Sequence, residues 1–250
     1  MSTVVAFAGA RGGVGRSEIA VVFARSAAKA GHKAAVIDAH EGEGSAGMLL
    51  GIDPHDTHER LPAWAAAVAD GPIGNEGLVA RMVAQGVDGV ALVRGASGFG
   101  WTLDNPVSMD RIVRSLEPVY EVIAIACPPV PTPAAFGAVR AAGSVVVVSD
   151  PATVGLYQTL QFLDLLREEK RPPRGLVVTC PHGERVGSAE PIADLLQCPV
   201  LGIAPFDRGL GGIGRPRDLD GAFGRAVRVA LDPILPGIAP AARKAWWKRG

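Results

Sequence analysis

The feature that most constrains the fold is a glycine-rich stretch near the start of the chain, which runs from Gly9 to Glu18 and reads GARGGVGRSE. It follows a short apolar run at 4–8 and precedes a helical pattern that opens at Ser17. A buried strand, a glycine loop and a helix N-terminus form a cradle for a nucleotide phosphate chain, because glycines let backbone N–H groups close on the phosphates. The stretch therefore predicts a strand–loop–helix unit that binds phosphate.

Two positions of this loop depart from the common phosphate-loop pattern, G-x-x-x-x-G-K-[ST]. Ala10 stands in place of the first glycine and Arg16 in place of the lysine, whereas Gly15 and Ser17 keep the pattern. The lysine of the pattern is a compact point charge, while an arginine guanidinium is longer and planar. The substitution keeps the positive charge for phosphate but changes the shape of the group that carries it.

The segment from Arg11 to Ser17, RGGVGRS, resembles the deviant Walker A loop of the ParA/MinD family, whose pattern is K-G-G-x-G-K-[ST]. Both lysines of that pattern are arginines in this chain. The resemblance implies a P-loop protein that binds ATP or ADP and works as a homodimer, with Arg11 reaching across the dimer to the nucleotide of the other subunit. Arginine keeps the charge and the hydrogen-bonding fork for such a contact. The nucleotide-binding residues implied in this loop are Arg11, Gly12, Gly13, Val14, Gly15, Arg16, Ser17 and Glu18.

A carboxylate closes the next strand pattern, at 34–38, which ends in Asp38. Ligands of open α/β sheets bind at the carboxyl ends of the strands, so we expect Asp38 close to the glycine loop. In the ParA/MinD family this strand commonly ends in D-x-D, and the second Asp orients the attacking water. His40 takes that position here, and a neutral imidazole accepts a hydrogen bond but has no fixed charge. The resemblance also implies that Ser17 and Asp38 hold any accompanying Mg²⁺.

The run from Tyr120 to Pro129, YEVIAIACPP, resembles the family's Walker B strand, [FY]-D-x-x-[IVL]-[IVL]-D-x-P-P. Ala126 stands where the family has the aspartate that supports Mg²⁺ coordination. Arg16 and His40 are changed as well, and each lost catalytic group commonly costs on the order of 10²-fold in rate. The resemblance therefore implies that hydrolysis is slow or lost.

The nucleotide base is expected near the ends of two later strands. In the family a V-x-N-[RK] segment reads adenine, and Thr179 takes the Asn position in the run GLVVTC at 175–180. A threonine hydroxyl makes one of the hydrogen bonds that the amide would make, which leaves the base preference open. Pro205 and Asp207, in the run at 200–207, resemble the family's I-P-x-D turn beside the base.

Two branches of the family share further features with this chain. The spacing from Asp38 through Leu50 to Asp53 is similar to the CpaE/TadZ branch, whose members serve pilus assembly as localisation factors. Trp64-Ala65, followed after four residues by Asp70-Gly71, resembles the W-A-x-x-x-x-D-G segment of the BcsQ-like branch, which assists bacterial cellulose synthesis. An ordinary core tryptophan explains the same residues, so both interpretations stay open.

Length and composition fit one large α/β domain, since the chain has 250 residues, of which 48% are hydrophobic, and a formal net charge of zero. Strand patterns at 89–93 and 144–149 alternate with helical patterns such as 154–168. This alternation predicts an α/β fold with a doubly wound, mostly parallel sheet and helices on both faces. We assign the P-loop domain to residues 1–235.

The cysteines and histidines do not indicate a metal or redox centre. Cys127, Cys180 and Cys198 lack ligand-like spacing and, without a signal peptide at the start, predict reduced thiols in a cytoplasmic protein. His55 and His58 lie in a polar segment that predicts a solvated loop. No apolar run approaches the length of a membrane span.

The end of the chain, 236–250, is expected to form a basic tail. From Leu201 onward there are nine basic and four acidic residues, and Trp246 and Trp247 lie among the last cations. Tryptophan beside lysine and arginine suits the headgroup level of an anionic membrane, and MinD-like proteins carry a membrane-targeting tail at this place. A docking segment for a protein partner, a solvated terminus and non-specific DNA binding are the alternatives, with DNA less favoured.

Two functions follow from the resemblance. The favoured one is a dimeric positioning or localisation factor that binds a nucleotide with weak or lost hydrolysis. It would serve a cellulose, exopolysaccharide or pilus secretion apparatus at the inner face of the cell membrane. The alternative is a slow but active ATPase for chromosome or plasmid partitioning or for division-site placement.

Overall fold

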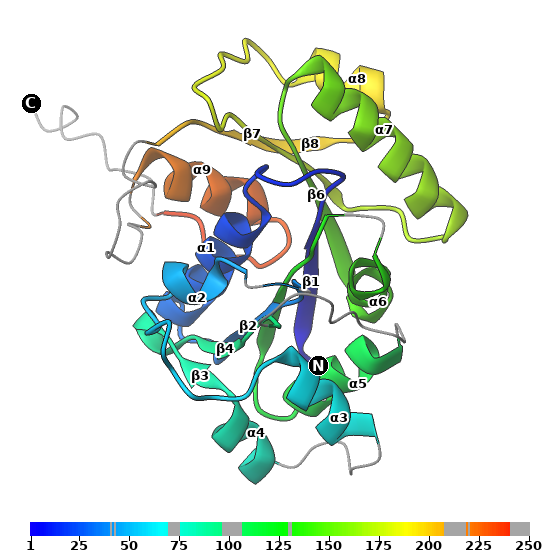
Figure 1. The fold of residues 1–250 in the computed structure, drawn as a ribbon. Helices are drawn as coiled ribbons and strands as arrows, with labels where there is room; N and C mark the ends of the chain where they lie inside the picture. Colours follow the sequence, from blue (N-terminus) through cyan, green and yellow to red (C-terminus); the bar gives the residue numbers. More distant parts are fainter. Residues whose placement is uncertain are drawn as a thin grey trace, which may run out of the picture.

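The computed structural model describes residues 1–40, 42, 44–69, 76–96, 107–129, 132–207, 219 and 221–240. An eight-stranded sheet forms the centre of this part, in the order β3-β4-β2-β5-β1-β6-β7-β8 (Figure 1). Every neighbouring pair is parallel except β3 and β4 at one edge. The strands are β1 (Thr3–Ala8), β2 (Ala34–Asp38), β3 (Ala84–Gln85), β4 (Ala91–Val93), β5 (Val122–Ala126), β6 (Ser144–Ser149), β7 (Gly175–Thr179) and β8 (Val200–Ala204).

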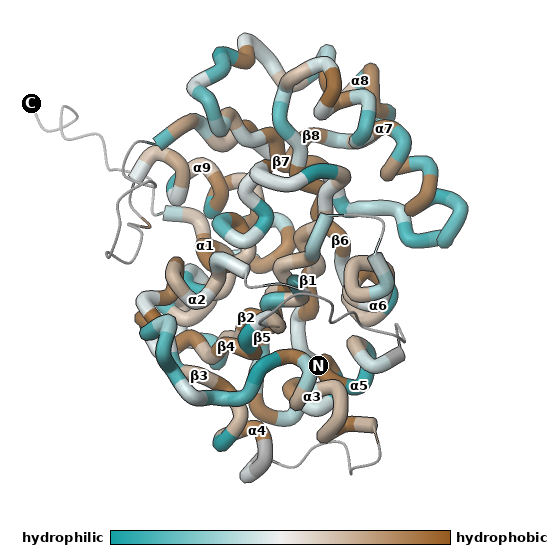
Figure 2. The backbone as a smooth tube through the Cα atoms, viewed as in Figure 1, coloured by the Kyte–Doolittle hydropathy of each residue, from teal (hydrophilic) through white to brown (hydrophobic). Residues whose placement is uncertain are grey.

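Helices cover both faces of the sheet, which confirms the predicted doubly wound α/β fold (Figure 1). The helices are α1 (Arg16–Lys29), α2 (Ala46–Leu49), α3 (Leu61–Ala69), α4 (Glu76–Met82), α5 (Val107–Leu116), α6 (Pro133–Ala141), α7 (Thr153–Glu168), α8 (Glu190–Leu196) and α9 (Ala222–Leu231), with a 3₁₀ turn η1 (Val87–Gly89). Hydrophobic residues are concentrated on the central strands, and hydrophilic residues are concentrated on the peripheral loops and helix ends (Figure 2).

Alternation along each strand divides the core into two layers. Val5 and Phe7 of β1 pack with α1, α2 and α9, whereas Ala6 and Ala8 pack on the face covered by α3 and by α5 to α8. Successive side chains of a strand point to opposite faces, and a sheet buried on both faces needs apolar residues at nearly every position. This explains why the strands read as almost unbroken apolar runs.

The strand order places β1 at the point where the chain changes direction across the sheet. The chain continues from β1 toward β2 on one side of it, and β6 begins the series on the other side. A crevice forms at the carboxyl ends of the strands at such a switch point, and ligands of open α/β sheets bind there. The glycine loop leaves β1 at this edge.

Some predictions fall at the margin of the described residues. Trp64 lies on α3 and is fully buried in the hydrophobic core, as expected of a core tryptophan. Asp70 and Gly71, the other half of the predicted motif, lie outside the described part of the chain. Residues 241–250, most of the predicted tail, also lie outside it, so the division at residue 235 stays a prediction. Among the described helices, none has the length and apolarity to cross a bilayer.

Candidate functional site

The glycine loop joins β1 to α1 through backbone conformations that require glycine. Gly13 and Gly15 have φ angles of 76° and 91°, in the left-handed region that side chains disfavour. A Cβ atom added to Gly9 would lie 2.5 Å from the carbonyl oxygen of Val148 on the neighbouring strand β6. Gly15 precedes the first residue of α1, and its carbonyl accepts a hydrogen bond from Ile19 at 3.0 Å. The loop is thus held close to the sheet, and the residue that precedes α1 makes no side-chain capping hydrogen bond.

Arg16 points inward from the first turn of α1. Its Nη1 atom donates to the carbonyl oxygen of Gly9 at 3.2 Å, and the residue is 5% exposed. Burial lowers the pKa of the guanidinium, and the neighbouring Cys127 and Glu18 side chains offset part of that shift. Burial likewise raises the pKa of the Cys127 thiol to about 12. The cation that replaces the usual lysine is therefore bound to the loop's own backbone.

Arg11 lies on the outer side of the loop and forms an ion pair within the same chain. Its Nη1 atom is 3.3 Å from Oδ2 of Asp150, and the two side chains are 41% and 6% exposed. Asp150 follows β6, and its Oδ1 accepts the backbone N–H of Ala152 at 2.9 Å, just before α7. The buried carboxylate thus orients a largely exposed guanidinium at the mouth of the site.

Asp38 ends β2 as predicted and is bound by protein N–H groups. Its Oδ1 atom is 2.6 Å from Nδ1 of His40 and 3.3 Å from the backbone nitrogen of His40. Its Oδ2 atom accepts the backbone N–H of Ala46 at 3.3 Å. Asp38 is 1% exposed, and Ser17, the other predicted metal ligand, is 6% exposed. The metal role of this pair stays a prediction.

Ala126 lies on β5 directly between Asp38 of β2 and Phe7 of β1 in the strand register. It is fully buried and packs in the layer that α1 covers. A methyl group therefore occupies the place where the family resemblance leads us to expect a carboxylate. It has no polar atom to orient a water molecule or a cation.

Thr179, at the end of β7, donates its hydroxyl toward the glycine loop. Its Oγ1 atom is 2.8 Å from the carbonyl oxygen of Val14 and 3.3 Å from that of Ser149. The side chain is buried, so its hydroxyl supports the loop in this structure, and its role in reading a base stays a prediction. Pro205 and Asp207 follow β8 and are exposed and half-exposed, respectively. Their place beside a base also stays a prediction.

Sequence reasoning assigned no role to three residues of this site. Gly9 allows the close approach to β6, Cys127 lies beside Arg16, and Asp150 pairs with Arg11. Asp150 follows the apolar run at 144–149, so the same rule that selected Asp38 at a strand's carboxyl end would have found it. No sequence pattern reveals the direction of the Arg16 side chain.

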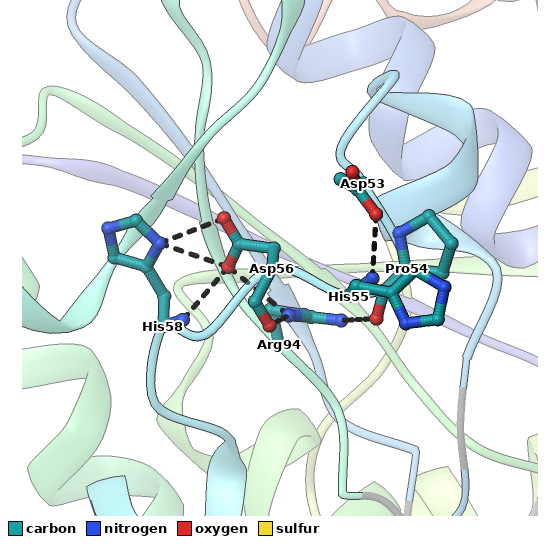
Figure 3. A network of polar contacts seen from close by, with 6 residues as sticks. All are labelled: Asp53, Pro54, His55, Asp56, His58 and Arg94. Carbon is teal, nitrogen blue, oxygen red and sulfur yellow. Dashed lines mark hydrogen bonds and ion pairs between the residues drawn. The ribbon is translucent and has the colours of Figure 1, made fainter.

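A polar network beside this edge fixes the segment that precedes α3 (Figure 3). Arg94, which follows β4, binds the carbonyl oxygens of Pro54 and Asp56 and lies 3.2 Å from Oδ1 of Asp56. Burial alone would raise the pKa of Asp56, but hydrogen bonds from His58 and the charge of Arg94 outweigh it, and the pKa is lowered. The backbone N–H of His55 donates to Oδ1 of Asp53 at 2.7 Å. The described residues contain no cluster of three metal-ligating side chains.

A glycine loop between a central strand and a helix, at the carboxyl edge of a doubly wound sheet, defines the class of P-loop nucleotide-binding folds. The chain belongs to the AAA_31 family of AAA domains, which matches residues 2–173.

The chain is similar to a MinD protein in sequence and to MinD and ParA proteins in fold. The septum site-determining protein MinD of a Synechocystis species is 24% identical over 213 residues, which cover 83% of this chain and 77% of that protein. MinD of Pyrococcus horikoshii, solved in complex with Mg-ADP, has a TM-score of 0.76 at 17% identity and covers 97% of this chain and 100% of its own. A ParA family ATPase from Chlorobium tepidum has a TM-score of 0.77 at 17% identity, covering 92% and 97% of the two chains. At these identities the solved structures support the fold alone.

Proposed function

We propose that this chain is a homodimeric positioning or localisation factor that binds ATP or ADP and hydrolyses it slowly or not at all. Its cargo would be a protein of a secretion apparatus for cellulose, another exopolysaccharide or a pilus. The single observation that carries the proposal is the coexistence of a glycine loop that keeps Gly13 and Gly15 with Ala126 at the end of β5. The loop retains the means to bind phosphate, while the carboxylate that catalysis needs is missing.

The contacts of the loop support nucleotide binding. Gly13 and Gly15 adopt the left-handed conformations that turn backbone N–H groups toward a phosphate, and α1 presents its N-terminus behind them. Two arginines supply positive charge, one within the loop and one at its mouth. Weak hydrolysis follows because His40 has no fixed charge and is bound to Asp38.

The position of Arg11 supports a dimer that depends on nucleotide. Arg11 is 41% exposed and held by Asp150, so its guanidinium is accessible to the phosphate of a second subunit. Val154 and Tyr157 in the first turns of α7 are 61% and 62% exposed and lie close to Asp150 in the chain. Apolar side chains beside a charged anchor favour a protein interface at this edge.

The test measures ATP affinity by isothermal titration calorimetry and turnover by phosphate release, for the native chain and for Arg16→Lys combined with Ala126→Asp. We expect the native chain to bind ATP with slow turnover and the double variant to release phosphate faster. Arg16→Ala is the matched control, because it removes the charge from the loop and should weaken binding. Light scattering with and without ATP measures the molecular mass in solution. We expect ATP to convert the native chain, but not Arg11→Ala, to a dimer.

The outcomes separate the hypotheses. A native chain that hydrolyses ATP at a rate typical of the ParA/MinD family would refute the weak-hydrolysis proposal. It would favour the alternative, an active ATPase for partitioning or division-site placement, which the likeness to a septum site-determining MinD supports. A native chain that binds neither ATP nor ADP at millimolar concentration would leave only a scaffold without nucleotide.

A further inference from the structure

The starting point is the environment of the Asp38 carboxylate. Both oxygens of Asp38 are hydrogen-bonded to protein nitrogens: Oδ1 to Nδ1 and the backbone nitrogen of His40, and Oδ2 to the backbone nitrogen of Ala46. The shortest contact, 2.6 Å to the imidazole, has the length of a strong hydrogen bond to a charged acceptor. Protein nitrogens therefore already occupy most of the hydrogen-bonding capacity of the Asp38 carboxylate.

Backbone atoms also pack closely around the Asp38 carboxylate. A Cβ atom added to Gly44 would lie 2.1 Å from Oδ2, and one added to Gly95 would lie 3.4 Å from Cγ of Asp38. These glycines pack directly against the carboxylate, whose side chain is 2% exposed. The segment is further fixed because the backbone N–H of Ala96 donates to the carbonyl oxygen of His40 at 3.1 Å. A cation that ligates Oδ1 of Asp38 would therefore have to displace the imidazole of His40.

The neighbouring strand provides no substitute. Mg²⁺ demands near-octahedral oxygen coordination and in nucleotide sites is usually held through one or two carboxylates together with the substrate phosphates. The register partner of Asp38 on β5 is Ala126, which has no ligand atom in its side chain. Only the Ser17 hydroxyl remains free for this role among the predicted ligands. Among the residues that the structure describes, the predicted ligand positions do not fit Mg²⁺.

Positive charge for the phosphates comes instead from the two arginines. Arg16 is held inside the loop, and Arg11 stands at its mouth with a partly exposed guanidinium. A guanidinium binds phosphate oxygens through paired N–H donors and needs no metal to do so. The two guanidinium groups thus suit a nucleotide whose phosphate charge is not reduced by a bound metal ion.

We infer that this chain binds its nucleotide as a metal-free anion, and that His40 determines this property by holding the Asp38 carboxylate. The inference rests on the proposed nucleotide binding, and it specifies that the ligand is the free nucleotide rather than its Mg²⁺ complex. His40 acts as a positioning residue, since it works through Asp38.

The test compares ADP and ATP affinities by calorimetry in excess Mg²⁺ and in excess EDTA. The native chain should bind each nucleotide with dissociation constants that agree within about threefold between the two conditions. In the variant His40→Asp with Ala126→Asp, added carboxylates repel the phosphates unless a cation intervenes, so affinity should fall at least about tenfold in EDTA and recover in Mg²⁺. His55→Asp introduces one of these two negative charges at an exposed loop residue and should leave the native pattern unchanged.

His40→Ala provides a second route if the double variant does not fold, because it releases Asp38 without adding charge. It should acquire a Mg²⁺ dependence that the native chain lacks. A native chain that binds ATP at least about tenfold more tightly in Mg²⁺ than in EDTA would overturn the inference. So would a His40→Ala variant with an unchanged response to Mg²⁺.

A separate readout distinguishes this failure from failure of the proposed function. If the native chain binds no nucleotide in either condition, the proposed function is wrong. The metal site is then tested by paramagnetic resonance titration of free Mn²⁺ with the protein alone. The inference predicts no Mn²⁺ bound by the native chain at the site and a gain of Mn²⁺ binding in the double variant. Mn²⁺ binding by the native chain that Asp38→Asn abolishes would contradict it.

Discussion

At the scale of single residues, each side chain that departs from the family pattern has a partner within the protein. Arg16 binds the carbonyl oxygen of Gly9, His40 binds Asp38, and the Thr179 hydroxyl binds the carbonyl oxygen of Val14. Ala126 fills its place with a methyl group in the apolar layer. The altered groups therefore contribute to the stability of the site, since a buried polar group without a partner would cost folding free energy.

These contacts mark the limit of what the sequence predicts about the site. Asp38 could be placed at the sheet edge because the end of an apolar strand fixes the position of the next residues. The direction of Arg16 depends on several rotatable bonds and on a carbonyl oxygen that becomes available only when the loop has folded. Asp150 lies far from Arg11 in the chain, and their ion pair exists because β6 lies beside β1.

Cys127 gives a prediction that depends on pH. Its folded-state pKa is raised by burial to about 12 from 9.0, so the unfolded chain loses this proton at lower pH than the folded chain. The free energy of unfolding should therefore fall as the pH rises from about 9 toward 12, because the native state binds more protons in that window. In Cys127→Ala this decrease should be smaller, as measured by urea unfolding at several pH values. Cys198→Ala, also at a buried thiol, is the control, and an equal decrease in both variants would contradict the assignment.

At the scale of elements, the sequence predicted the central strands well. The patterns at 34–38 and 144–149 coincide with β2 and β6 as observed, because a strand buried on both faces is a compact apolar run. The pattern at 89–93 is shorter in the structure, since Val87–Gly89 forms a 3₁₀ turn with Asp88 at a φ angle of 57° before β4 begins. The antiparallel strand β3 has only two residues, too few for any periodicity to indicate.

The contact between β8 and α9 yields a prediction at this scale. A Cβ atom added to Gly202 of β8 would lie 2.7 Å from the Cβ of Ala230 on α9, closer than real side chains approach. Gly202→Val should therefore force α9 away from the sheet and reduce the free energy of unfolding by about 1–3 kcal/mol. Gly187→Ala is the matched control, since a Cβ at that glycine meets no atom within 4 Å. Urea unfolding measures both, and equal stability of the two variants would contradict close packing at Gly202.

At the scale of the whole molecule, the alternation of strands and helices was sufficient to predict the fold class. Handedness and burial rules leave few arrangements for such an alternation, and the doubly wound sheet is the commonest. The segment from 61 to 85 was harder, because its helices are short and weakly patterned and are fixed by packing against α5 and the sheet. The branch within the family depends on partner surfaces, which the fold does not determine.

The tail gives a prediction at the molecular scale. We expect the full chain to sediment with vesicles that contain anionic lipid at low salt, because cations and tryptophans suit the headgroup region. A chain truncated after Pro240 should stay in the supernatant while keeping the same melting temperature. Trp246→Ala with Trp247→Ala is the control that retains the charge, and it should bind more weakly than the native chain. Undiminished sedimentation of the truncated chain would refute membrane binding by the tail.

Asp38 and Ala126 are direct neighbours across β2 and β5, and this adjacency links any change at position 126 to the stability of the sheet edge. A change to aspartate at position 126 would set a second carboxylate beside one that is already buried and bound by His40, and like charges in such surroundings repel strongly. Any gain of turnover from that carboxylate would therefore be accompanied by a loss of folding stability for as long as no cation lies between the two groups.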